Sequence, residues 1–139
     1  MYTHEIKVRV RYKETDNMGV VHHANYAVYY EYARTELLRE RGVTYRQMEE
    51  QGVMMPVREV SSVFLASAHY DDLLTIRTCI EELTPVKIVF SHEIFNEAGV
   101  RLNTGRVVLV FMDAAKRRLT RAPKWFTDLF AETASPSSK

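Results

Sequence analysis

Residues 12–26 hold the side chains of this chain that are best suited to chemistry. Asp16 stands among turn residues, where a carboxylate can act as a nucleophile or a general base. His22 and His23 follow, and a helical apolar pattern begins near Asn25. The start of a helix presents unpaired backbone N–H groups that suit an oxyanion. This arrangement fits attack on a carbonyl carbon, while an ordinary turn with two loop histidines is the alternative interpretation.

The periodicity of apolar residues predicts the elements that position this segment. Residues 4–12 alternate between apolar and charged side chains, which is typical of a half-buried strand. From Asn25 a helix of about 16 residues is predicted, because apolar residues recur at helical spacing and Gly42 follows the last turn. A short second helix is expected from Thr44 to Glu50. Further strands are expected in residues 53–66, 74–80, 86–94 and 100–112.

This order of elements predicts the α+β class, with one long helix against one face of an antiparallel sheet. Such a sheet leaves its other face open, and the many alternating apolar residues favour association of copies. We therefore expect a homo-oligomer. Residues 1–130 are expected to form a single domain, and the polar residues 131–139 a C-terminal tail.

Composition argues against several classes of protein. The chain has 139 residues and a formal net charge of +1, which gives no overall attraction to nucleic acid or acidic membranes. The single cysteine, Cys79, excludes an intrachain disulfide and fits a reducing compartment. No apolar run has the length of a membrane span, and the N-terminal residues are charged. We expect a cytoplasmic protein that neither binds nucleic acid nor inserts into a membrane.

The five histidines raise the question of a metal site. His22 and His23 are adjacent, which spreads their side chains apart, and no pair of histidines has the spacing of zinc ligands. Cys79 stands alone. We therefore expect neither a metal nor a cofactor.

The segment resembles the signature of the hotdog-fold acyl-CoA thioesterases of the 4-hydroxybenzoyl-CoA thioesterase family, especially the bacterial YbgC/FadM-type branch. The resemblance covers about residues 4–125, and the predicted order of elements agrees with it. It implies a hotdog fold, an antiparallel sheet wrapped around one long central helix. The matching residues are Tyr12, Thr15, Asp16, Gly19, Val20, Val21, His23, Asn25, Tyr26, Tyr30, Glu31, Ala33, Arg34, Tyr70, Asp71, Asp72, Leu73, Val110, Phe111, Met112, Asp113 and Pro123.

The resemblance also implies an activity, the hydrolysis of acyl-CoA thioesters to free acid and coenzyme A. Asp16 would supply the catalytic carboxylate, either as nucleophile or as general base. The backbone N–H of His23 would polarise the thioester carbonyl, and its side chain is expected to assist. The branch usually has an aromatic residue where this chain has His22. This departure leaves open which of the two imidazoles assists.

Substrate binding is expected at two places. Asn25, Tyr26 and Tyr30 are expected to bind the substrate. Tyr30 would line the acyl pocket because it faces the Tyr26 side of the helix, and core packing is the alternative interpretation of these tyrosines. A basic cluster that includes Arg121 and Lys124 is a candidate subsite for the phosphates of coenzyme A, because cationic side chains bind phosphate. A solvated surface turn is the alternative interpretation of this cluster.

Two classes of function stay open at this point. One is a thioesterase that acts on acyl-CoA or on an acyl carrier protein. The other is a non-catalytic hotdog module that binds acyl groups or a protein partner. Asp16 and His23 favour the enzyme, since a binding module does not need that carboxylate. The sequence does not distinguish a dimer from a tetramer, or an aromatic from an aliphatic acyl group.

Overall fold

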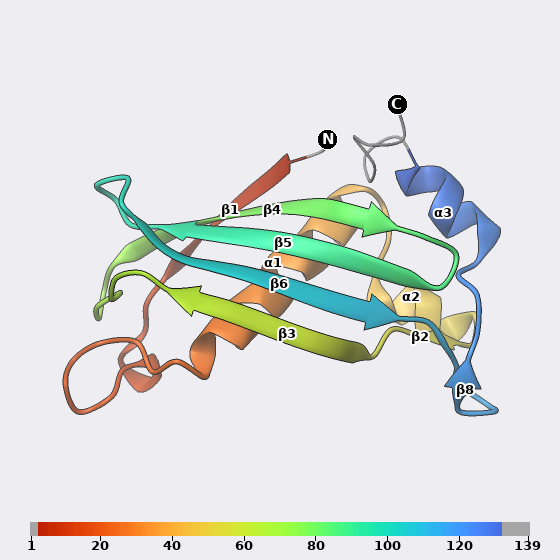
Figure 1. Ribbon diagram of the computed structural model, residues 1–139, viewed down its shortest axis with the longest axis horizontal. Coiled ribbons are helices and arrows are strands. Elements are labelled where there is room, and N and C mark those ends of the chain that lie inside the picture. The colour runs from red at the N-terminus through yellow and green to blue at the C-terminus, as the bar shows by residue number, and fades with distance from the viewer. Residues whose placement is uncertain (1–2, 132–139) are drawn as a thin grey trace.

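The computed structural model describes residues 3–131 (Figure 1). Apart from Ala131, the expected polar tail of residues 131–139 lies outside the described residues. The elements are β1 (Thr3–Arg9), η1 (Tyr12–Glu14), α1 (Asn25–Glu40), α2 (Tyr45–Glu50), β2 (Val53–Met54), β3 (Val57–Phe64), β4 (Leu73–Leu83), β5 (Lys87–Phe95), β6 (Arg101–Val110), β7 (Met112–Asp113), β8 (Arg118–Leu119) and α3 (Lys124–Phe130).

The main sheet has five strands in the order β1-β4-β5-β6-β3, and each neighbouring pair is antiparallel. A smaller sheet has the order β2-β7-β8. Helix α1 crosses one face of the main sheet, and the curved strands bend around it (Figure 1). The α+β class predicted from the sequence is therefore confirmed.

Helix α1 packs on the sheet through the apolar stripe that its sequence predicts. Tyr26, Tyr30, Ala33 and Leu37 recur at helical spacing, and all four are buried. The ring of Tyr30 lies directly over Gly105 of β6, where a Cβ atom would overlap the ring. Glycine at this position therefore allows the helix and the sheet to approach closely.

The element boundaries differ from prediction where local chemistry interrupts a pattern. The strand expected over residues 53–66 divides into β2 and β3 around Pro56, which has no N–H for a sheet ladder. Helix α3 was not predicted, although Phe126 and Phe130 have helical spacing and are both fully buried. Their burial holds this short helix against the rest of the fold.

The sheet face opposite α1 is polar, so the expectation of an open apolar face is wrong. Residues of β4 that point away from α1 include Arg77, which pairs with Glu5 at 2.9 Å and with Glu93 at 3.7 Å. Exposed apolar side chains gather instead on the edge strand β3 and just after it. They are Val57, Val60, Val63, Phe64 and Leu65.

His92 of β5 lies buried between the sheet and α1. Its Nδ1 is 2.9 Å from Thr78 Oγ1, and its ring stacks on Tyr30 with 4.7 Å between the ring centroids. Burial, reinforced by the charge of Arg34, lowers the pKa of His92 from 6.5 to about 3. The imidazole is therefore neutral in the folded chain at neutral pH.

We predict that His92 makes the fold sensitive to acid. Between pH 6.5 and about pH 3 the unfolded chain takes up a proton here that the folded chain does not. The stability is thus complete above pH 6.5 and is lost toward pH 3, by about 1.4 kcal/mol per pH unit. Urea unfolding from pH 7 to pH 4 should show this slope removed in His92→Gln and kept in His69→Gln, an exposed control. Equal slopes in all three proteins would contradict the prediction.

Candidate active site

Asp16 lies in a loop that backbone hydrogen bonds close. Its N–H donates to the carbonyl of Val20 at 2.9 Å, and the N–H of Gly19 donates to the carbonyl of Asp16 at 3.0 Å. Gly19 has φ +81°, a conformation that glycine adopts without strain. The N–H of Val21 donates to Ala68 at 2.8 Å, which ties the loop to the segment after β3. The backbone thus fixes the place of Asp16.

The Asp16 carboxylate is half-buried and uses one oxygen to support its own loop. Oδ1 accepts hydrogen bonds from the N–H groups of Met18 at 2.8 Å and Val20 at 3.4 Å. Within residues 3–131 no donor is assigned to Oδ2. This second oxygen is therefore open to a substrate or to water.

The turn that begins α1 leaves one backbone donor open. The N–H of Ala24 donates to Nδ1 of His22 at 3.1 Å, and the N–H of Asn25 donates to the His22 carbonyl at 3.0 Å. The N–H of His22 itself donates to the Glu14 carbonyl at 2.9 Å. In the described part of the chain the N–H of His23 has no assigned acceptor. It is therefore free to donate to an oxyanion at the helix start.

The two histidines have different surroundings. His22 is engaged by its own turn, because its Nδ1 accepts the Ala24 N–H. The His23 ring stacks on that of His22, with 4.2 Å between the centroids. Only His23 of the pair lines the pocket that contains Asp16.

This pocket, of about 370 Å³, lies between the loop, the start of α1 and the residues after β3. It brings together three of the predicted site residues, Asp16, His23 and Tyr26. The Tyr26 ring meets Phe64 edge-on at 5.2 Å, so an apolar wall stands beside the carboxylate. The remaining lining residues are Val21, Leu65, Ala66 and Ser67.

Two other predicted residues lie outside this pocket and support its frame. The side chain of Asn25 donates from Nδ2 to the Glu14 carbonyl at 2.9 Å. Tyr30 is fully buried, and its hydroxyl bonds to Ser62 and Asn103 beneath the helix. Within one chain both residues are therefore placed as structural supports.

The basic cluster lies at the other end of the main sheet from the Asp16 loop (Figure 1). Lys124 pairs with Asp128 at 2.9 Å, one turn further along α3. Arg121 instead lines a separate pocket together with Arg58 and Lys87. The structure of one chain does not bring Arg121 or Lys124 to the Asp16 pocket.

Glu14 is a site residue that the sequence analysis missed. Its side chain is buried and accepts hydrogen bonds from the backbone N–H of Arg11, the Arg11 guanidinium and the Tyr29 hydroxyl, at 2.8–2.9 Å. Burial alone would raise the pKa of Glu14, but these hydrogen bonds outweigh it and lower the pKa below 4.5. Its carbonyl receives the N–H of His22 and the side chain of Asn25. Glu14 thus joins the loop to α1.

We predict that Glu14→Gln destabilises the fold by about 1–3 kcal/mol, since it breaks charged hydrogen bonds to a buried group. Urea unfolding at pH 7 measures the change. Glu81→Gln is the matched control, because Glu81 pairs with Arg106 on the exposed face of the sheet. Its loss should stay below about 1 kcal/mol. Equal losses in the two variants would show that Glu14 is not a special anchor.

No group of three or more His, Cys, Asp or Glu side chains in residues 3–131 is arranged to hold a metal ion. The helices of the same residues include none that is long and apolar enough to cross a membrane.

Comparison with known proteins gives consistent matches. The chain is 37% identical over 117 residues to the acyl-CoA thioester hydrolase YbgC of Escherichia coli. The matched segment covers 84% of this chain and 87% of that protein. It is 34% identical over 134 residues to the acyl-CoA thioesterase YbgC of Helicobacter pylori, with 94% and 98% covered. The crystal structure of the DHNA-CoA thioesterase from Staphylococcus aureus matches with a TM-score of 0.90 at 30% identity, over 95% of this chain and 91% of that one.

The fold and the site together define a class. A sheet wrapped around one helix, with a carboxylate and an open N–H at the helix start, is the arrangement expected of a hotdog thioesterase, and the solved structure supports that fold. Residues 10–130 match the thioesterase-like superfamily, and the chain belongs to it.

Proposed function

We propose that the protein hydrolyses acyl-CoA thioesters to a free acid and coenzyme A. One observation carries the catalytic part of this proposal: the open Oδ2 of Asp16 and the open N–H of His23 belong to residues that line one pocket. The acyl-CoA thioester hydrolase YbgC of Escherichia coli, at 37% identity, supports coenzyme A as the thiol. We further propose that the protein is cytoplasmic, because its single cysteine, Cys79, fits a reducing compartment, and that residues 1–130 form one domain.

The proposed chemistry needs few groups. The thioester oxygen accepts the His23 N–H, which stabilises negative charge as the carbonyl carbon becomes tetrahedral. Asp16 then acts in one of two ways: it attacks that carbon to form a mixed anhydride that water cleaves, or it takes a proton from the attacking water. In both routes the thiolate of coenzyme A leaves, which a thiol pKa of about 8.5 permits without a strong acid. His23 lines the same pocket, where its imidazole assists the reaction.

We predict that Asp16→Asn lowers the turnover of acyl-CoA at least about 100-fold, because the amide keeps the shape and removes the anion. Release of free thiol measures the rate, and circular dichroism checks the fold. Asp128→Asn, at an exposed carboxylate on α3, is the control and should keep full activity. Near-normal turnover in folded Asp16→Asn would overturn the mechanism.

A single turnover in H₂¹⁸O separates the two routes for Asp16. Label in the Asp16 carboxylate identifies direct attack, because it arises only when water cleaves the anhydride at the Asp16 carbonyl. General-base catalysis leaves label only in the acid product.

We propose that two copies associate through β3. This strand is one of the two edges of the main sheet, and its outer side has no neighbouring strand in the described chain (Figure 1). Exposed Val60 and Val63 lie on it, and a twofold axis requires two identical strands to pair antiparallel. Such pairing centred between Val60 and Ser61 puts Phe64 of one strand opposite Val57 of the other. The Asp16 pocket, which Phe64 lines, would then adjoin the second copy.

We predict that Val63→Lys weakens this association, since a charge on an edge strand opposes strand pairing. Light scattering at micromolar concentration should show a dimer or a multiple of it for the parent chain and a shift toward monomer for Val63→Lys. Val100→Lys, at an exposed residue of the β5–β6 turn, should leave the assembly unchanged. A monomeric parent chain would refute the proposal.

Arg121 is the member of the basic cluster that we propose for the nucleotide end of coenzyme A. Its pocket also contains Arg58 and Lys87 around apolar Val110, whereas Lys124 is engaged by Asp128. A higher KM of Arg121→Ala for acyl-CoA, with no such change for acyl-pantetheine, would support the assignment. An unchanged KM would instead support the alternative interpretation, in which the cluster is a solvated surface turn.

A further inference from the structure

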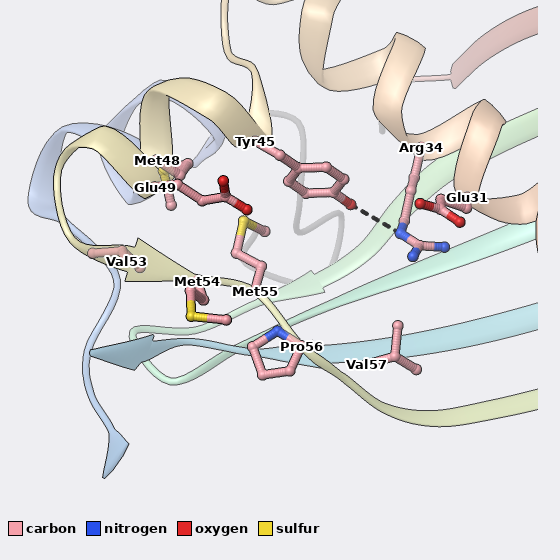
Figure 2. A pocket seen from close by; sticks show the side chains of 10 residues that line it. All are labelled: Glu31, Arg34, Tyr45, Met48, Glu49, Val53, Met54, Met55, Pro56 and Val57. Atoms are coloured by element: carbon pink, nitrogen blue, oxygen red, sulfur yellow. Dashed lines mark hydrogen bonds between the residues drawn. The ribbon is translucent and has the colours of Figure 1, made fainter. Parts of the chain in front are cut away.

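Arg34 of α1 is a buried cation that forms no ion pair with residues 3–131. The residue is 6% exposed, and its Nε donates to the Tyr45 hydroxyl at 2.9 Å (Figure 2). No carboxylate oxygen of residues 3–131 lies within 4.0 Å of its guanidinium nitrogens. The guanidinium also lines a pocket, so its terminal nitrogens can donate to a group that enters from outside.

A pocket of about 330 Å³ lies next to this guanidinium. Arg34 and Tyr45 stand on its helical side, and the segment from Met54 to Val57 faces them (Figure 2). Most of its wall is apolar. The apolar lining residues are Met48, Val53, Met54, Met55, Pro56 and Val57.

The groups around the pocket select the charge of a ligand. The terminal nitrogens of Arg34 are donors in a planar fork, which matches the two oxygens of a carboxylate. Glu31 and Glu49 also line the pocket and are exposed. Their negative charges oppose a dianionic phosphate more strongly than a monoanion. We propose that this pocket binds the carboxylate of an organic acid with an apolar body, with Arg34 as its counter-charge.

Two sources can supply this carboxylate. One is a free acid, such as the product of the proposed hydrolysis. The other is the far end of a dicarboxylic acyl group during the reaction. Arg34 lies about 14 Å along α1 from Asn25, too far for a short acyl group within one chain. Pairing of β3 between copies would bring the Val57 side of this pocket toward the Asp16 pocket of the other copy.

The first experiment measures binding and does not depend on the proposed activity. Calorimetry measures the binding of hexanoate to the full chain. Arg34→Gln should raise the Kd for hexanoate at least tenfold. Arg39→Gln is the matched control, because Arg39 is an exposed arginine further along α1 that pairs with Glu36. Its Kd should equal that of the parent chain.

A second pair of variants keeps Arg34 and so keeps the test valid if Arg34→Gln does not fold. Met55→Glu adds a third carboxylate to the pocket, beside Glu31 and Glu49, and should weaken hexanoate binding at least tenfold. Met55→Gln has the same length without the charge and should bind at least ten times more tightly than Met55→Glu.

The second experiment identifies a dicarboxylic acyl group, and it rests on the proposed function. Adipoyl-CoA and hexanoyl-CoA have acyl chains of equal length, and only the first has a distal carboxylate. Arg34→Gln should raise the KM for adipoyl-CoA at least tenfold and leave hexanoyl-CoA unchanged if the acyl group is the source. Binding of hexanoate that depends on Arg34, with equal kinetic effects on both substrates, would instead identify a free acid.

The inference is overturned if hexanoate does not bind the parent chain, or binds Arg34→Gln as tightly as the parent chain, and Arg34→Gln changes the KM for both substrates alike. If no acyl-CoA is hydrolysed by the parent chain, the proposed function fails. The calorimetric comparison of the Arg34 and Met55 variants still decides the binding site in that case.

Discussion

The buried carboxylate of Glu14 is the interaction on which the arrangement of the site depends. The carboxylate accepts hydrogen bonds from the Arg11 guanidinium and the Tyr29 hydroxyl. The backbone carbonyl of Glu14 accepts the N–H of His22 in the turn that begins α1. One residue thus fixes both the loop before the helix and the first turn of the helix. Because Asp16 follows Glu14 by two positions, this anchor also fixes the place of the Asp16 carboxylate. The His23 N–H is set by the same anchor from the other side.

Helix α1 connects three polar environments that serve different purposes. Its first turn presents a donor to the Asp16 pocket, and Tyr30 in its middle packs against the neutral His92. Arg34, one turn beyond Tyr30, adds its positive charge to the burial that keeps His92 unprotonated. The helix is therefore more than an apolar support for the sheet. Its buried face carries polar groups whose charges influence one another.

The sequence was sufficient for the features that arise from local pattern. Apolar spacing located α1, and turn residues beside a helix start located Asp16 and His23. The partners of Glu14 could not be predicted, because Tyr29 comes within reach only after the loop folds onto the helix. Tyr30 was expected near the acyl group, but its burial depends on Gly105, which comes from a strand far along the chain.

The polar outer face of the sheet was missed for a related reason. Alternation indicates which residues share a face, but the ion pairs of Arg77 become visible only once the strand register is known. The same holds for α3, whose two buried phenylalanines have helical spacing over too short a segment to predict a helix. Contacts between distant segments, rather than local preference, determine these parts of the fold.

The open donor at the start of α1 is the backbone N–H of residue 23, so it is present whichever side chain, other than proline, occupies that position. Most substitutions at position 23 alter the side chain and leave that N–H in place, so the proposed oxyanion contact would remain. Proline is the exception, because it lacks the N–H altogether. We therefore expect that selection for the activity excludes proline from position 23.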